Sequence, residues 1–281
     1  MKKIEHVIIC YGDNLGYHHG AKYQILSAYD RWYSDNESST CVVTDRPELF
    51  ENYPCRLLEL DPAKRHKWSL GGAQHFGIKL QGTLWALKTS PAKCVLALDT
   101  DMYWIKDPSR VADKVTDLSI VMYRNEGRVY KTNNLSIKRF EEGLKDKRFG
   151  TTHGQYSLSH DSQMWASNIL GLNQSHRELL EYAFELFSIL EPHVEAHTVE
   201  QYSIAEAARI LHFEKHQAHK YLSNWSSTGR KNYVTPVLDE FFQRYGENNF
   251  NEHLLNWRRI QIKRPILKFI NQKLNKTFRR E

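Results

Sequence analysis

Residues 94–108 read CVLALDTDMYWIKDP, and this stretch decides how the rest of the chain is interpreted. The apolar run Cys94–Leu98 is typical of a strand that is buried on both faces. Asp99 and Asp101 follow at its carboxyl end, and alternation along an extended chain points both carboxylates to one side. Adjacent carboxylates repel each other unless a cation neutralises them, and Mg²⁺ or Mn²⁺ binds carboxylate oxygens together with substrate phosphates. The stretch therefore predicts a buried strand that ends in a metal–diphosphate site.

Strand and helix patterns alternate on the amino-terminal side of this stretch. Apolar runs predict strands at residues 4–10, 40–44 and 56–60. Helical spacing of apolar residues predicts helices over residues 20–32 and 80–89. This alternation predicts an α/β fold, a mostly parallel sheet with helices on both faces, whose ligands bind beyond the carboxyl ends of the strands.

The carboxyl-terminal side continues with one strand and a series of helices. A strand is predicted over residues 117–123, and the polar, weakly periodic residues 124–160 predict a loop-rich region near a site. Capping patterns and helical spacing predict helices over residues 175–190 and 198–211, and Thr235-Pro236 predicts the start of a helix that ends at Gly246.

Charge divides the 281 residues into a body and a tail. The net charge is +6, but residues 254–281 hold nine Lys or Arg and one Glu, which leaves about −2 for the rest. After Pro265, apolar and basic residues fall on opposite helical faces, and Trp257 precedes them. We therefore predict a catalytic domain at 1–246 and a basic amphipathic C-terminal extension at 247–281 that binds an anionic membrane surface.

The sequence also bears on where in the cell the protein is expected. Neither a membrane-spanning run nor a signal-peptide core is present in the sequence, and the four cysteines lack metal-binding spacing. We expect a cytoplasmic protein that is peripheral on the inner face of the cell membrane. No nucleic acid is expected as a partner, because no RNA- or DNA-binding motif accompanies the basic tail.

The stretch GIKLQGTLWALKTSPAKCVLALDTDMYWIKDP (77–108) resembles the lysine-to-D-x-D segment of nucleotide-sugar-dependent glycosyltransferases with the GT-A fold. The similarity is strongest to the glycogenin-like and bacterial lipopolysaccharide galactosyltransferases. It implies a Rossmann-like GT-A sheet, a hexosyltransferase activity, a nucleotide-diphosphate sugar as donor, and Mn²⁺ or Mg²⁺ bound by the D-x-D carboxylates.

The resemblance also implies the residues of the site. The donor nucleotide and diphosphate would be bound by residues of the first loop, of the D-x-D segment and of the region before residue 235: Tyr11, Gly12, Asp13, Tyr17, Lys79, Asp99, Thr100, Tyr221 and Lys231. Segments 160–172 and 199–207 resemble the family's sugar-binding strand and helix, with Asp161, Gln163, Glu200 and Gln201 as catalytic candidates. Asp161 and Glu200 stand where the family has Asn and Asp.

The third metal ligand of the family has no matching motif here. His216 and His219 are the nearest candidates, and His219 is the residue that we select beside Asp99 and Asp101. Trp225 lies between them and Lys231, the expected diphosphate cation.

These observations predict a metal-dependent transfer of a sugar from a nucleotide diphosphate to a hydroxyl of a glycan or lipid-linked acceptor, as in bacterial surface polysaccharide synthesis. The resemblance favours retention of anomeric configuration, whereas inversion would need a base such as Asp161 or Glu200. A non-catalytic nucleotide-sugar-binding or membrane-adaptor module is the alternative. A D-x-D phosphatase is disfavoured because Tyr103 stands where its signature has Thr or Val.

Overall fold

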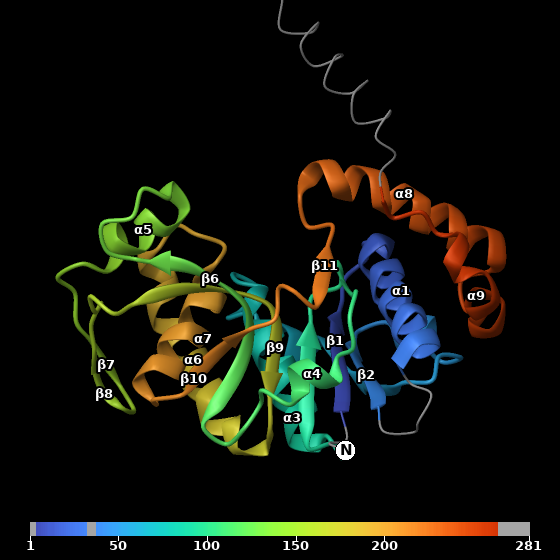
Figure 1. Ribbon diagram of the computed structural model, residues 1–281. Coiled ribbons are helices and arrows are strands. Elements are labelled where there is room, and N and C mark those ends of the chain that lie inside the picture. Colours follow the sequence, from blue (N-terminus) through green and yellow to red (C-terminus); the bar gives the residue numbers. More distant parts are fainter. Residues whose placement is uncertain (1–3, 33–37, 264–281) are drawn as a thin grey trace, which may run out of the picture.

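A seven-stranded sheet in the order β10-β6-β9-β4-β1-β2-β3 forms the centre of the molecule, seen in a computed structural model that describes residues 4–32 and 38–263 (Figure 1). The strands are β1 (Ile4–Cys10), β2 (Ser38–Thr44), β3 (Arg56–Glu59), β4 (Cys94–Leu98), β6 (Ser119–Arg128), β9 (Gln163–Leu172) and β10 (Glu214–Gln217). Strand β9 is antiparallel to its neighbours β4 and β6, and the other pairings are parallel. The mostly parallel α/β sheet predicted from the sequence is confirmed.

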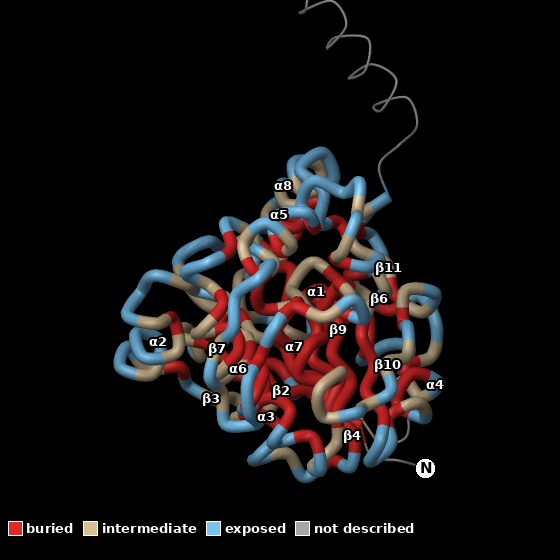
Figure 2. Tube along the Cα trace, turned by 90° about the vertical axis from the view of Figure 1, so that its left-hand side faces the viewer, coloured by how far each residue is buried: buried red, intermediate tan, exposed pale blue. Residues whose placement is uncertain are grey.

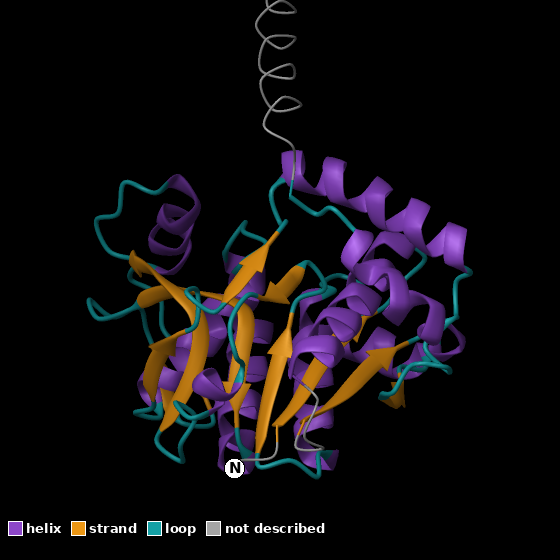
Figure 3. Cartoon of the chain, turned by 45° about the vertical axis from the view of Figure 1, so that its right-hand side comes forward, coloured by secondary structure: helices purple, strands orange, loops and turns teal. Residues whose placement is uncertain are grey.

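Helices cover both faces of this sheet (Figure 3). They are α1 (Leu15–Trp32), α2 (Pro62–Trp68), α3 (Phe76–Thr89), α4 (Ser109–Ala112), α5 (Leu135–Leu144), α6 (Arg177–Leu190), α7 (Val199–Ile210), α8 (Thr228–Tyr245) and α9 (Phe250–Asn256). The described residues also form short 3₁₀ helices at Pro47–Leu49, Gln174–His176, Glu191–His193 and Trp257–Arg259. Side chains alternate along β1, so that Val7 packs in the cluster with α3, α6 and α7, while Ile8 packs in the cluster with α1 and α8.

The hydrophobic core lies along the central sheet. All five residues of β4 are buried because the strand lies between β1 and β9, and buried residues concentrate at the centre of the molecule while α2 and α5 lie at its edge (Figure 2). This central position explains why the apolar run of β4 is continuous rather than alternating.

Residues 124–160 contain more regular structure than the sequence predicts. Strand β6 extends to Arg128, α5 follows, and β7 (Phe149–Thr151) pairs with β8 (Gly154–Tyr156) in a hairpin. Helix α5 is stabilised by burial of Ile137, Phe140 and Leu144, whose spacing places them on one face. The prediction of a mainly irregular region was therefore wrong for these segments.

The C-terminal helices also differ from the prediction. Helix α8 begins at Thr228, and Pro236 lies inside it rather than at its first turn. Helices α8 and α9 cover α1 (Figure 1), and Trp257 and Ile260 are buried in the cluster that contains α1 residues. The described part of residues 247–263 is thus packed on the body. The division at residue 247 stays a prediction, and the amphipathic helix expected after Pro265 lies outside the described residues.

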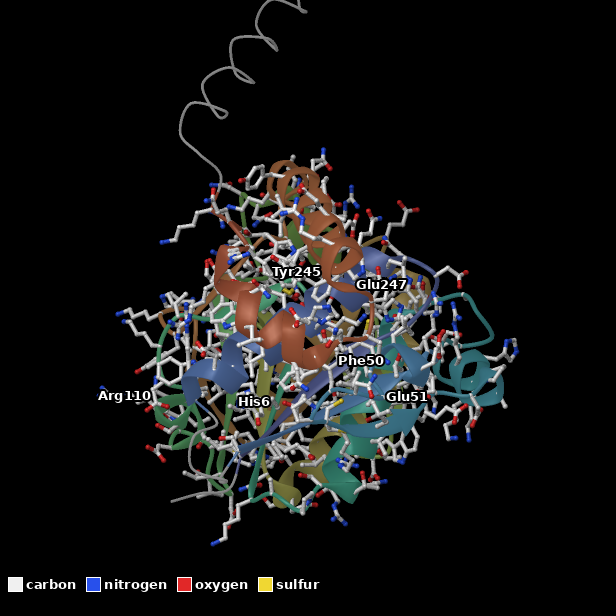
Figure 4. The ribbon with its side chains drawn as sticks, turned by 90° about the vertical axis from the view of Figure 1, so that its right-hand side faces the viewer. His6, Phe50, Glu51, Arg110, Tyr245 and Glu247 are labelled. Atoms are coloured by element: carbon white, nitrogen blue, oxygen red, sulfur yellow. The ribbon has the colours of Figure 1, made fainter. Side chains whose placement is uncertain are left out.

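A buried lysine joins α1 to these C-terminal helices. Lys22 is fully buried and donates to the backbone oxygen of Glu247, and its ammonium is 3.4 Å from the Glu247 carboxylate. The rings of Phe50, Tyr53 and Phe242 surround the ammonium at 5.4–5.9 Å. Glu247 and Phe50 accordingly lie on the same side of the molecule (Figure 4).

No helix in the described ranges 4–32 and 38–263 combines the length and apolar character needed to cross a membrane.

Candidate active site

A cavity of about 410 Å³ opens where β1 and β4 end. Nine residues predicted for the site line it: Tyr11, Tyr17, Lys79, Asp99, Thr100, Asp101, Glu200, Gln201 and Lys231. They come from the loop after β1, from α1, α3, the loop after β4, α7 and α8. A parallel sheet brings such distant segments together at its carboxyl edge, which is where ligands of open α/β sheets bind.

Asp99 is held on both of its carboxylate oxygens. Oδ1 lies 2.7 Å from Lys79 Nζ, and Oδ2 accepts a hydrogen bond of 3.0 Å from Asn168 Nδ2. The backbone N–H of Asp99 donates to the Asn168 oxygen, which continues the pairing of β4 with β9. The position of this carboxylate is therefore fixed by α3 and β9 before any ligand binds.

Lys79 connects Asp99 to a second carboxylate. Its ammonium donates to the backbone oxygen and hydroxyl of Ser167 at 2.8 and 3.0 Å and lies 3.6 Å from Glu200 Oε1. Burial lowers the pKa of Lys79, but Asp99 and Glu200 outweigh burial and hold this pKa above its ordinary value. Lys79 is therefore a permanent cation in the floor of the cavity.

Glu200 is the third carboxylate of the cavity. Its side chain is 5% exposed and accepts hydrogen bonds from Ser167 Oγ at 3.1 and 3.2 Å. Burial raises the pKa of Glu200, Lys79 lowers it in part, and Asp99 raises it again. The neighbouring Gln201 also lines the cavity, with its amide 3.5 Å from Met164 Sδ.

Asp101 differs from Asp99 because one of its oxygens has no partner. Oδ2 lies 3.2 Å from Lys231 Nζ, whereas Oδ1 is buried without a hydrogen-bond donor among the described residues. Burial and then repulsion from Asp99 raise the pKa of Asp101, and Lys231 opposes this increase. A buried carboxylate oxygen without a donor is energetically costly unless a cation or donor reaches it.

Helix α1 fits closely against the loop that carries these carboxylates. A side chain on Gly20 would place its Cβ 2.4 Å from the backbone oxygen of Thr100, so only glycine allows this approach. Gln24 donates to the backbone oxygen of Asp99 from the next turn of the same helix. The loop is therefore held from α1 through its backbone, which leaves its side chains directed to other partners.

The loop after β1 forms the opposite side of the cavity. Gly12 has a φ of +86°, and its N–H donates to both oxygens of Asp45 at 3.0 and 3.1 Å. Arg65 lies over the Tyr11 ring at 5.8 Å and pairs with Asp45 at 2.8 Å. Tyr17, with 45% exposure, presents an aromatic ring at the cavity mouth. Gly12 and Asp13 do not line the cavity, although they adjoin Tyr11.

Two catalytic candidates lie away from the cavity. Asp161 is exposed ahead of β9, and Gln163, at the start of β9, accepts hydrogen bonds from Asn125 and Trp165. Gln163 lies five positions before Asn168, roughly 17 Å along an extended strand. The structure therefore corrects the placement: the cavity end of segment 160–172 is Ser167-Asn168, while Asp161 and Gln163 belong to the other end.

The predicted third metal ligand is also not assembled. Within residues 4–32 and 38–263, no three His, Cys, Asp or Glu side chains are grouped so that they could hold a metal ion. His219 donates its backbone N–H to the Tyr123 oxygen, and its buried Nδ1 has no partner in this part of the chain. Tyr221 contacts Lys106 and Lys114 instead of the cavity. The two aspartates still fit a Mg²⁺-type ion, because such ions use one or two carboxylates and complete their shell with substrate phosphates and water.

Several cavity residues were not predicted: His75, Phe76, Thr83, Ser167, Asn168, His197 and Thr198. Ser167 and Asn168 lie within segment 160–172, but the candidates predicted from that segment, Asp161 and Gln163, are among its first residues. The apolar run that follows Asn168 indicates a buried strand, but only the antiparallel pairing of β9 with β4 places Ser167 and Asn168 at the end of β4.

Comparisons with known proteins complete the description of this site. No protein-family model and no curated protein sequence matches the chain. Among solved structures, the galactosyltransferase LgtC in complex with donor and acceptor sugar analogs is similar at 11% identity, covering 75% of this chain and 72% of its own, with a TM-score of 0.49. Mouse xyloside xylosyltransferase 1 in its apo form is similar at 11% identity, covering 76% and 84%, with a TM-score of 0.47. The chain thus has structural similarity to two glycosyltransferases over about three quarters of its length.

Proposed function

We propose that this chain is a metal-dependent glycosyltransferase of the GT-A type, which transfers a sugar from a nucleotide diphosphate to an acceptor hydroxyl. In this reaction the bond between the anomeric carbon and the diphosphate oxygen breaks. A bond from the anomeric carbon to the acceptor oxygen forms, the hydroxyl proton is released, and the nucleoside diphosphate leaves.

The observation that carries the proposal is the state of the two aspartates at the end of β4. Asp99 is fixed by Lys79 and Asn168, whereas Asp101 Oδ1 is buried without a partner in the described chain. A divalent ion bound by Asp99 and Asp101 would supply positive charge to the diphosphate. The cavity beside them also contains the aromatic ring of Tyr11, which suits a flat nucleotide base.

The lysines of the cavity suit the same substrate. Lys231 is 43% exposed on its side chain and lies next to Asp101, so its ammonium can reach a diphosphate oxygen without leaving the site. Lys79 is 19% exposed and remains charged through its carboxylate partners. Its role in the proposal is to fix Asp99 and Glu200 in place.

We also propose that configuration is retained. The acidic side chains that line the cavity, within the described residues, are Asp99, Asp101 and Glu200. Asp161 lies outside it, and Glu200 is bound by Ser167 and lies near Lys79. A retaining reaction needs no strong base, because the leaving diphosphate can assist. NMR assignment of the product's anomeric configuration tests this, and an anomer opposite to that of the donor would contradict it.

The test of the proposed function is a panel of nucleotide-diphosphate sugars with Mn²⁺, Mg²⁺ or EDTA, with release of nucleoside diphosphate as the measurement. We expect turnover of at least one donor, dependence on the metal, and loss of turnover in Asp99→Asn and Asp101→Asn. Asp113→Asn, an exposed carboxylate at the end of α4, is the control. Donor binding without turnover would instead support the non-catalytic module, and release of inorganic phosphate would support a phosphatase.

For the acceptor we propose a glycan or lipid-linked glycan of bacterial surface polysaccharide synthesis, reached from the cytoplasmic face of the membrane. The support is the basic amphipathic pattern of residues 264–281 in the sequence. Trp257, expected to be part of a membrane-binding face, is buried instead. Replacing Lys268, Lys273, Lys276, Arg279 and Arg280 with Gln in the full chain should abolish sedimentation with anionic vesicles, and unchanged sedimentation would contradict this proposal.

A further inference from the structure

Two adjoining cavities lie on the α8 side of the molecule, outside the pocket at the end of β4. The first, about 900 Å³, is lined by Tyr23, Tyr103, Trp257, Arg258 and residues 260–263 among others. The second, about 590 Å³, shares Tyr103, Ile262 and Lys263 with the first. We call the two together the aromatic groove. Its size suits a ligand of several rings.

The floor of the aromatic groove is a cluster of rings from four separate segments. Tyr103 stacks on Trp225 with centroids 5.8 Å apart, and Tyr23 contacts Tyr103, Trp225 and Trp257 edge-on at 5.8–6.1 Å. The segment after α9 runs back beneath α8 toward β11 (Leu222–Asn224) and brings Trp257 to this cluster (Figure 1). Trp257 is 3% exposed, and its indole N–H has no acceptor among the described residues. Tyr23, Trp225 and Trp257 are buried and support the floor from behind, whereas Tyr103 and Tyr233 are partly exposed where they line the groove. The apolar face of a partly exposed ring suits the C–H face of a sugar.

The rim of the aromatic groove is cationic. Arg31, Arg230, Arg258 and Lys263 line it, and none of its described lining residues is acidic. Arg258 keeps one ion pair, with Asp30 at 2.7 Å, and Arg31 lies over the Trp257 ring at 5.1 Å. The pocket at the end of β4, in contrast, contains three carboxylates. Guanidinium groups bind carboxylates and phosphates through paired hydrogen bonds, so the complementary ligand carries negative charge.

An intermediate cavity shares lining residues with both the aromatic groove and the proposed donor pocket. This cavity of about 410 Å³ shares Tyr17, Thr100, Asp101 and Lys231 with the donor pocket and Trp225 with the groove. An oligosaccharide in the groove that receives a sugar would have to extend its end through this intermediate cavity to Asp101. A bilayer surface cannot enter concave cavities of this kind, whereas a glycan chain can.

We propose that the aromatic groove binds an acidic oligosaccharide, the acceptor whose end receives the sugar. The assignment of this oligosaccharide as the acceptor rests on the proposed function. Its binding to the groove needs neither donor nor metal. Tyr103 and Tyr233 support the sugar faces, the buried rings hold Tyr103 in place, and the four cations select the negative charge.

The test uses the full chain and tetragalacturonate, a chain of four sugars that each carry a carboxylate, with its neutral methyl ester as the matched probe. Calorimetry should detect tetragalacturonate binding that weakens with added salt, and much weaker binding of the ester. The Arg31→Gln/Arg258→Gln variant should lose about tenfold or more in affinity. Arg244→Gln/Arg259→Gln removes the same charge outside the groove and should bind as the original chain does.

Any of three results would overturn the inference. They are no binding of tetragalacturonate up to millimolar concentration, equal affinity for the ester, and equal losses of affinity in the two double variants. Loss of binding to phosphatidylserine vesicles in Arg31→Gln/Arg258→Gln, with no tetragalacturonate binding by the full chain, would assign the surface to lipid instead. Lys263→Gln provides a second variant if Arg258→Gln lowers the melting temperature. Donor hydrolysis is measured in parallel. Binding of tetragalacturonate without any donor turnover would contradict the proposed function but would still support oligosaccharide binding in the groove.

Discussion

The chain places a lysine against carboxylates in two regions, and the two lysines are used differently. Lys22 is fully buried under aromatic rings and bonds to Glu247, and burial lowers its pKa. Lys79 opens onto a cavity, and its neighbours Asp99 and Glu200 raise its pKa despite burial. The first lysine joins helices, and the second arranges polar groups around a space. A lysine–carboxylate contact therefore indicates a functional site only when the pair also faces a cavity, as Lys79 does and Lys22 does not.

The largest effect on activity is expected at Asp101, in the cavity at the end of β4. Asp101→Asn should lower kcat/KM for the donor by about 10³-fold, about 4 kcal/mol of transition-state stabilisation, because the charge beside the diphosphate is lost. The melting temperature should stay the same or rise, since burial and Asp99 disfavour the charged form of Asp101. Steady-state kinetics and calorimetric melting measure both. An activity loss below tenfold would remove Asp101 from the proposed site.

The direct comparison of the two lysines comes next. Lys79→Met leaves Asp99 and Glu200 without their cation, and activity should fall by about 100-fold as the carboxylates rearrange. Lys22→Met places an apolar chain among rings and should cost about 1–3 kcal/mol of unfolding free energy, with activity of the remaining folded protein nearly unchanged.

Urea unfolding and activity at 20 °C distinguish the two variants. If Lys22→Met lost as much activity per folded molecule as Lys79→Met, the two regions would not be separate in function.

A smaller effect is expected at the exposed lysine of the cavity. Lys231→Ala should raise the donor KM by about tenfold through loss of one charge-assisted contact, with little change in stability, because exposed ion pairs contribute little to folding. Lys220→Ala, an exposed lysine outside the cavity lining, is the matched control. An unchanged KM would place the diphosphate away from Lys231.

The smallest effect is a dependence of folding on acid. Burial lowers the pKa of His6 to about 3 and that of His253 to about 4. Each folded-state pKa lies below the unfolded value of about 6.5, so stability is complete above that pH and is lost as the pH falls toward the folded value. From pH 7 to 5.5, His6 and His253 should each lower the unfolding free energy by about 1 kcal/mol, because both folded-state pKa values lie well below this range. Urea unfolding at several pH values measures this, and His253→Asn should flatten the dependence.

Much of the fold was accessible from the sequence because its signals are local. The strands predicted at 4–10 and 94–98 coincide with β1 and β4, and the strand predicted at 56–60 is one residue longer than β3, since continuous apolar runs mark strands. Helix α8 was predicted too short because Pro236 indicates a helix start by local rules, whereas packing on α1 carries the helix through it. Helix α5 was missed because three buried residues in a polar segment give a weak period.

The sequence predicted the chemistry of the site but not all of the residues that line it. Asp99 and Asp101 are identified by their position after a buried strand, and Lys79 by resemblance. Asn168 was missed because its position depends on the antiparallel pairing of β9 with β4, which no local pattern encodes. His219 was selected as a nearest candidate to the family's ligand motif, and nearness in sequence does not fix where a loop brings a side chain. The roles of these residues stay predictions until the variants are measured.

The strand order has a consequence for how the chain is synthesised. Strands β1 to β4 are adjacent in the sheet and complete once residue 98 has been made, so a ribosome-bound chain can form this half early. Strand β6 cannot join it, because β9 must be inserted between β4 and β6 and ends only at Leu172. Until then, the edges of β4 and β6 are unpaired and open to wrong partners. Synthesis that pauses between residues 98 and 172 should therefore expose the nascent chain to aggregation more than a pause at any later point.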